Sequence, residues 1–360
     1  MASRRPRFFH SALMASCFAA ALFSHRASAA DLSPAEAIYA HLADMPAAER
    51  TAAIEAGARK EGAITIIQTL RSALGDGQIQ LFQNRYPFLK VDWTSSLGSP
   101  EATERLLAEE TAGRHLTDAV NVAILDFVDL IQHDLLARYK SPVDDRVLPH
   151  YRAFADPQYR WTLTYWSDRG VIYNTNLVPP DKAPKQWMDL CDPFFKRSIE
   201  FDSVEARFVA GLYAVMGEKL HDFMKCLGAN EPIIVRGQFL TLMLAGDHMV
   251  NADSYPYQAI AAQRKDPSAP VGFMSSRPII ASFGGVGINR NTIHPYAAAL
   301  FTDWMLSDES QNYLAKSLRG PIAIKHPYLP DDADVVAPDL PKSVLDPLVD
   351  EWKREVEHSK

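Results

Sequence analysis

Serine and arginine side chains that suit an anionic ligand follow two expected strands in the first third of the chain. Arg71 stands just after the apolar run 63–70, and a guanidinium forms paired hydrogen bonds with a carboxylate or a phosphate. Ser96 and Ser99 precede a helix that should have Ser99 as its N-cap and Pro100 at its first position. The free N–H groups of that helix would favour negative charge. A solvated arginine and ordinary capping explain the same residues.

A second set of polar and aromatic residues lies in the middle of the chain. Trp166 and Arg169 precede the apolar strand 170–174, where an aromatic face could cover an organic ligand or pack into the protein interior instead. The other candidates follow strands expected at 198–201 and 249–251. They are Asp202, Ser203, Arg207, Asn251, Tyr255 and Tyr257. Because ligands bind at the carboxyl ends of parallel strands, we expect these residues to face one cleft.

The sequence offers few groups for nucleophilic catalysis or for a metal site. Cys191 and Cys226 are the only cysteines beyond the first 29 residues, and they could pair in an oxidising compartment or remain buried thiols. Asp189 and Asp192 flank Cys191 and would raise the pKa of its thiol, and no base is implied beside either cysteine. The sequence contains no zinc-type spacing of cysteine or histidine.

The N-terminus reads as a signal peptide over residues 1–29. Arginines at positions 4, 5 and 7 precede an apolar run at 12–23, and Ala27-Ser28-Ala29 has the small-residue pattern of a cleavage site. Its removal takes away four arginines and no acidic residue, so the net charge of −7 becomes −11. This charge argues against nucleic-acid partners, and no later apolar stretch is long enough to predict stable membrane insertion.

Strands and helices alternate along the rest of the chain, which predicts a parallel α/β sheet. The β-branched run 63–70 has the composition of a buried strand, and the positions of Ile79, Phe82 and Tyr86 predict a helix after it. About 330 residues exceed what one core serves, so two lobes are expected. Residues 326–360 are rich in proline and aspartate and should wrap the surface. Further strands are expected at 89–93, 118–125, 170–174, 198–201, 233–235, 249–251 and 280–288.

Several segments resemble the family-1 extracellular solute-binding proteins of bacterial ABC importers, including the ferric-iron-binding branch. The similar segments are Arg59-Lys60-Glu61-Gly62, Gly170-Val171-Ile172-Tyr173-Asn174-Thr175-Asn176-Leu177-Val178-Pro179, Pro184-Lys185-Gln186-Trp187-Met188-Asp189-Leu190, and His294-Pro295-Tyr296-Ala297-Ala298-Ala299-Leu300-Phe301. The resemblance implies the type II periplasmic-binding-protein fold, with two lobes, two crossing hinge strands and a ligand cleft between the lobes. It also implies a periplasmic protein that closes on a small solute and delivers it to an inner-membrane ABC permease, with no cofactor of its own.

The crossing strands expected from this resemblance contain 170–174 and 284–289. Glycines in both segments would permit the backbone changes of a hinge. The first lobe is expected to comprise residues 30–169 together with 290–360. The second lobe is expected to comprise residues 170–289, including the crossing strands.

The resemblance to the ferric-binding branch also concerns Tyr255 and Tyr257, because members of that branch place adjacent tyrosines in the same loop. Here Pro256 separates the two tyrosines, and Gln68-Thr69-Leu70-Arg71 stands where the family has an early tyrosine or histidine ligand. An anionic organic or phosphorylated solute is therefore expected. Ferric iron, held by Tyr255 and Tyr257, is the other candidate solute.

Two other functional classes explain parts of the sequence. One is a secreted enzyme on the same fold, similar to thiaminase-like proteins, with a cysteine nucleophile in the cleft. The other is an interaction module that binds no small molecule. A ligand-dependent rise in melting temperature would separate a solute-binding protein from such a module.

Overall fold

The computed structural model of this chain describes residues 32–70, 72–201, 206–234, 239–331, 333–337 and 340–357. The expected signal peptide and the candidate residues Arg71, Asp202 and Ser203 lie outside the described residues. Within them, the chain forms a mixed sheet with helices packed on both faces, so the predicted α/β class is confirmed. None of the helices in this part of the chain is both long and apolar enough to cross a bilayer.

The first lobe is built on three parallel strands, β1 (Ala63–Gln68), β2 (Lys90–Thr94) and β3 (Ala119–Ala123). The alternating side chains of β1 face opposite ways: Ile64 and Ile66 join one core, whereas Ile67 joins the other. This is why the run reads as continuously apolar in the sequence. The helices of this lobe are α1 (Pro34–Ala43), α2 (Ala47–Glu61), α3 (Ser72–Arg85), α4 (Ser99–Thr111), α5 (Phe127–Gln132), α10 (Pro295–Met305) and α11 (Asp308–Lys316).

The second lobe repeats this plan with β5 (Ile199–Phe201), β6 (Ile233–Ile234) and β7 (Val250–Ser254), which are also parallel. Phe201 and Val250 face a core beneath α6 (Ala206–Met216) and α7 (Lys219–Ala229). Ile172 faces the opposite side, where α8 (Phe239–Ala245) and α9 (Pro256–Lys265) cover the sheet. Both lobes thus direct the carboxyl ends of their parallel strands toward the middle of the molecule.

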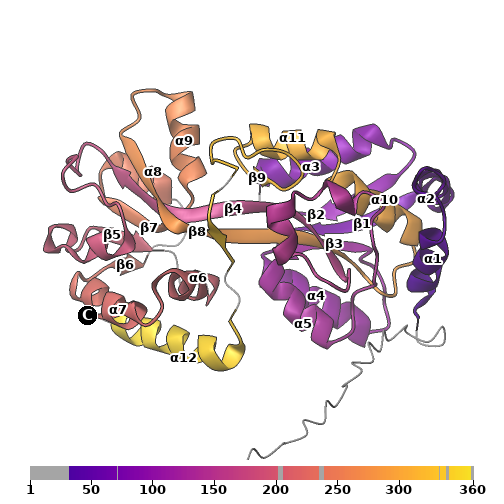
Figure 1. Cartoon of the computed structure of the whole chain (residues 1–360), viewed down its shortest axis with the longest axis horizontal. Helices are drawn as coiled ribbons and strands as arrows, with labels where there is room; N and C mark the ends of the chain where they lie inside the picture. Colours follow the sequence, from indigo (N-terminus) through magenta and orange to yellow (C-terminus); the bar gives the residue numbers. More distant parts are fainter. Residues whose placement is uncertain are drawn as a thin grey trace, which may run out of the picture. The chain divides into compact units, whose positions relative to one another are not determined.

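Two long antiparallel strands connect the lobes. β4 (Trp161–Asn174) and β8 (Val271–Ile288) pair along most of their lengths, in the strand order β2-β1-β3-β8-β4-β7-β5-β6. Figure 1 shows both strands running between the two groups of helices. The expected crossing segments 170–174 and 284–289 are therefore only parts of longer strands. Alternation along the strand now decides which β4 side chains face the ligand cleft.

The C-terminal segment corrects the sequence analysis. After β9 (Gly320–Pro321) pairs with β4, the chain follows the crossing strands, and β10 (Val335–Val336) pairs with β8. Helix α12 (Lys342–Trp352) then packs against α6, with Trp352 fully buried beside Phe201 and Phe208. This helix therefore belongs to the second lobe. It was expected on the surface as part of the first lobe, because proline and aspartate concealed its apolar face.

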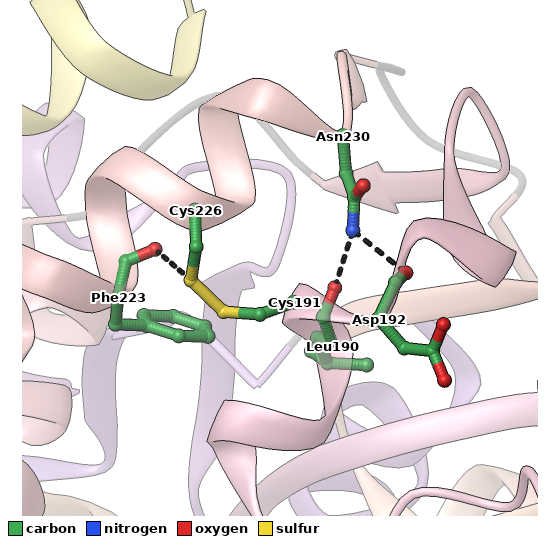
Figure 2. Close-up of a disulfide and its surroundings, with 6 residues drawn as sticks. All are labelled: Leu190, Cys191, Asp192, Phe223, Cys226 and Asn230. Atoms are coloured by element: carbon green, nitrogen blue, oxygen red, sulfur yellow. Dashed lines mark hydrogen bonds between the residues drawn. A yellow bond between two sulfur atoms is a disulfide. The ribbon is translucent and has the colours of Figure 1, made fainter.

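Cys191 and Cys226 form a disulfide in the second lobe (Figure 2). The bond joins the short 3-10 helix η5 (Trp187–Cys191) to α7, and it settles the alternative that the sequence left open. Beside it, the Asn230 side-chain amide donates to the carbonyls of Leu190 (2.8 Å) and Asp192 (3.0 Å). A nucleophilic cysteine requires a free thiolate, and both sulfurs are bonded to each other here.

Candidate ligand-binding site

A cavity of about 400 Å³ lies where the strands of both lobes end beside β4 and β8. Polar side chains dominate its lining, which among the described residues includes several hydroxyls, three arginines and one carboxylate. The lining residues are Thr69, Leu70, Gly98, Ser99, Ala123, Tyr165, Ser167, Arg169, Arg207, Asp253, Ser254, Tyr255, Tyr257, Gln258, Ser282, Phe283 and Arg319. The position matches the general rule that α/β sheets bind ligands beyond the carboxyl ends of their strands.

The first lobe contributes small groups to the cavity. Gly98, not Ser99, is the N-cap of α4, and its extended backbone (φ −75°, ψ 171°) makes Ser99 the first helical residue. The Ser99 hydroxyl accepts from the backbone N–H of Ala123 (3.1 Å), so it links α4 to the end of β3. The expected cap is therefore wrong, although Ser99 does line the cavity. Ser96 does not line it, because its hydroxyl pairs with Thr94 at the exposed edge (3.1 Å).

A buried ion pair forms part of the opposite wall. Arg169 on β4 contacts Asp253 on β7, and each side chain is only 4% exposed. The Arg169 guanidinium also lies 5.1 Å from the centre of the Tyr255 ring, a distance typical of a cation–π contact. Because the carboxylate offsets the arginine charge at close range, this pair positions donors and contributes little net charge.

Arg207 forms a second ion pair. It stands in the first turn of α6, and its Nη1 lies 3.1 Å from Oδ2 of Asp126 in the 3-10 helix η2 (Ile124–Asp126) of the first lobe. Both side chains are about one-fifth exposed. The contact therefore joins the two lobes at the cavity.

Arg319 was missed by the sequence analysis. It lies between α11 and β9, and its Nη1 donates to the hydroxyl of Ser167 (2.9 Å). Its guanidinium stacks 4.0 Å from the centre of the Tyr257 ring and 5.8 Å from that of Tyr255. No sequence motif marks this residue, since the cavity acquires it only when β9 pairs with β4.

Alternation along β4 separates cavity residues from core residues. Tyr165, Ser167 and Arg169 line the cavity, whereas Trp166 is fully buried on the other face beside Phe283. The interior role left open for Trp166 is thus the one observed. Burial raises the pKa of Tyr165 to about 12, so its phenol stays protonated at neutral pH. Gly284 provides the space for this ring, because a Cβ there would lie 2.3 Å from Cε1 of Tyr165.

Asn251 is also absent from the cavity wall. It is fully buried on β7, and its amide donates to Oε1 of Glu200 on β5 (3.3 Å). The sequence analysis expected it at the end of a strand 249–251, but β7 continues to Ser254, so the residues that reach the cavity are Asp253, Ser254 and Tyr255.

The two tyrosines expected for iron both line the cavity, with ring centres 5.7 Å apart. Two arginines lie over these rings: Arg169 over Tyr255, and Arg319 over both. In the part of the chain that the structure describes, no group of three or more His, Cys, Asp and Glu side chains could hold a metal ion. The described wall therefore offers phenols surrounded by guanidinium groups.

Known structures share this fold. Iron-bound HitA from Pseudomonas aeruginosa matches with a TM-score of 0.69 and 18% identity, over 81% of this chain and 98% of that one. A substrate-binding protein of an Agrobacterium tumefaciens ABC transporter gives 0.70 and 14%, over 83% and 96%. Actinobacillus pleuropneumoniae AfuA, with fructose-6-phosphate bound, gives 0.64 and 19%, over 82% and 99%. A search of curated protein sequences finds no significant match.

These matches are to two-lobe binding proteins, so they confirm the predicted fold. A family model described as "bacterial extracellular solute-binding protein" matches residues 126–344. The matched range includes β4 and most of the charged wall. It also includes the second lobe as far as the first residues of α12. The chain therefore belongs to the family of bacterial extracellular solute-binding proteins.

Proposed function

We propose that this chain is the periplasmic substrate-binding subunit of an ABC importer and that it captures a small anionic solute. The family match supports the transport role. The observation that supports an anionic solute is the cavity wall, where the described lining residues include Arg169, Arg207 and Arg319 and a single acid, Asp253. Lobe closure brings these arginines and the α4 N-terminus to the same solute, and the closed form is what the permease receives.

The solute class follows from the donors. Guanidinium forks and hydroxyls match the oxygens of carboxylates and phosphates, and Ser99 lies at the positive end of α4. The AfuA structure with fructose-6-phosphate supports a phosphorylated organic solute on this fold. A cavity of about 400 Å³ has room for a small molecule of that kind.

Ferric iron is a second candidate solute, because Tyr255 and Tyr257 both line the cavity. Phenolates are suitable ligands for a hard trivalent cation, and the similar fold of iron-bound HitA supports this candidate. The arginines over both rings argue for the anion, since a guanidinium repels a metal cation at this distance.

Thermal denaturation with a panel of solutes tests the proposal. We expect inorganic phosphate, a sugar phosphate or a small carboxylate to raise the melting temperature, and a neutral sugar to leave it unchanged. A ligand at 100 times its dissociation constant stabilises the folded state by about 2.7 kcal/mol, which is readily measured. Tyr255→Ala should weaken the shift while the fold persists, and Tyr255→Phe should retain most of it. A shift with ferric salts alone would favour the iron candidate, and no shift with any solute would contradict solute capture.

A further inference from the structure

The arginines of the cavity differ in how the protein compensates their charge. Arg169 pairs with Asp253, and Arg207 pairs with Asp126. Arg319 makes no ion pair with any carboxylate of the described residues, since the Asp168 carboxylate acts on it only at longer range, and its guanidinium lies over the rings of Tyr257 and Tyr255. A ring quadrupole attracts a cation but does not neutralise it. Arg319 is therefore the cavity cation whose charge the described protein leaves least compensated.

The backbone fixes Arg319 in place. Leu318 before it adopts the left-handed conformation (φ +61°), which is uncommon for a residue with a branched side chain. Gly320 after it packs against Trp166, where a Cβ would lie 2.6 Å from Nε1 of the indole. Gly320 and Pro321 also pair with Trp166 and Tyr165 of β4. The segment 318–321 thus holds the arginine at the floor of the cavity.

The hydrogen-bonding capacity of Arg319 is largely unused by the protein. A guanidinium carries five N–H donors, and one bond, from Nη1 to Ser167, occupies this group. Its Nε is enclosed without an acceptor. A buried N–H donor without an acceptor costs free energy. An oxyanion that supplies the acceptor therefore gains more binding free energy here than at an arginine that already pairs with a carboxylate.

We infer that Arg319 is the specificity-determining residue that binds the anionic group of the solute, while Arg169 and Arg207 chiefly shape the site through their carboxylate partners. This inference rests on the proposed function, because it names the residue that makes the same cavity selective for an oxyanion. Carboxylates and phosphates share this chemistry, and the experiment below separates them.

Isothermal titration calorimetry of the full mature chain with inorganic phosphate and, separately, with acetate tests the inference. We expect Arg319→Met to lose at least ~30-fold in affinity for whichever probe binds the parent, because bonds to charged groups are strong. Arg319→Lys keeps the charge without the fork and should bind with intermediate affinity. Arg197→Met removes one exposed arginine that pairs with Glu231 away from the cavity, and it should bind like the parent.

Melting curves without probe distinguish binding from a structural role. If Arg319 binds the solute, Arg319→Met should melt near the parent temperature but lose the probe-dependent shift. Arg319→Lys should then restore part of that shift. Equal affinity in the parent and Arg319→Met would overturn the inference and leave the proposed function standing. A parent that binds neither probe would overturn the inference, and the panel of solutes in the thermal denaturation experiment then decides the proposed function. If Arg319→Met fails to fold, a parent-like affinity of Arg319→Lys contradicts selection by the guanidinium fork.

Discussion

The two walls of the cavity differ in chemistry. Among the residues that the structure describes, the wall from the first lobe carries no charged side chain and consists of Thr69, Leu70, Gly98, Ser99 and Ala123. The facing wall carries the large charged and aromatic side chains Arg169, Arg207, Tyr255 and Tyr257, with Arg319 at the floor. Within the described part of the chain, the charged groups of the cleft are therefore concentrated on one side. The other side supplies a close fit and the positive end of α4.

This difference predicts that substitutions in the two walls weaken binding and stability by unequal amounts. A buried guanidinium interacts with charged partners, so its removal changes the electrostatics of the whole wall. A serine hydroxyl contributes one neutral hydrogen bond, worth about 1 kcal/mol. The variants below probe the two walls in order of expected effect.

Arg169→Met should have the largest effect. It removes the guanidinium from a buried pair with Asp253, so we expect the free energy of unfolding to fall by about 3 kcal/mol or more. Anion binding should fall strongly as well, because Asp253 is left in the cavity as a carboxylate whose charge Arg169 no longer offsets. Urea denaturation and calorimetry measure the two losses separately.

The double variant Arg169→Met/Asp253→Asn controls for the Asp253 carboxylate, which the single variant leaves in the cavity without Arg169. It should recover much of the stability, because the buried charge is gone, and part of the binding, because the Arg169–Asp253 pair contributes little net charge. An affinity of the double variant as low as that of Arg169→Met would show that Arg169 binds the anion itself.

Glu200→Gln probes the carboxylate behind the same wall. Burial raises the pKa of Glu200 to about 7, and the nearest basic group is His248, with Nε2 3.8 Å from Oε2. The folded protein therefore binds this proton more tightly than the unfolded chain does. That contribution to stability is complete below about pH 4.5 and is lost as the pH rises through about 7.

Glutamine imitates the protonated acid, so Glu200→Gln should raise the unfolding free energy by ~2 kcal/mol at pH 8 and change it little near pH 4.5. Anion affinity should stay within a few-fold of the parent value, because Glu200 lies outside the cavity. Urea denaturation at the two pH values measures the effect. A pH-independent difference between parent and variant would show that titration of Glu200 is not its cause.

Tyr257→Ala should have a moderate effect on binding. The ring supports the Arg319 guanidinium at 4.0 Å, and such contacts contribute about 1 kcal/mol. We expect roughly fivefold weaker anion binding by calorimetry, because 1.4 kcal/mol corresponds to tenfold. Tyr257→Phe keeps the ring face and should bind like the parent. Equal losses in both variants would indicate instead that the hydroxyl contacts the solute.

Ser99→Ala should have the smallest effect. The Ala123 N–H loses its acceptor, which costs about 1 kcal/mol of stability, and the affinity for the anion should fall only a few-fold. Chemical denaturation and calorimetry of this variant complete the comparison of the walls. A loss of affinity as large as that of Arg319→Met would contradict the conclusion that the charged wall contributes more to anion binding than the first-lobe wall does.

Sequence reasoning located the fold better than the site. Helices and strands follow from local periodicity, two lobes follow from the chain length, and Arg207, Tyr255 and Tyr257 follow from the rule about strand ends. Which side of β4 faces the cavity depends on the pairing register, so the sequence could not show that Arg169 lines the cavity whereas Trp166 packs in the interior. Arg319 reaches the cavity through the pairing of β9 with β4, a contact about 150 residues apart in the chain that no local pattern reveals.

The most direct test of the account is to identify what co-purifies with the protein, by native mass spectrometry and metal analysis before and after denaturing release. The account predicts a released organic or phosphorylated anion, about one per chain, whose loss in Arg319→Met parallels the loss of binding. Stoichiometric iron with a visible phenolate charge-transfer band would contradict it. That result would assign the cavity to a metal held by Tyr255 and Tyr257.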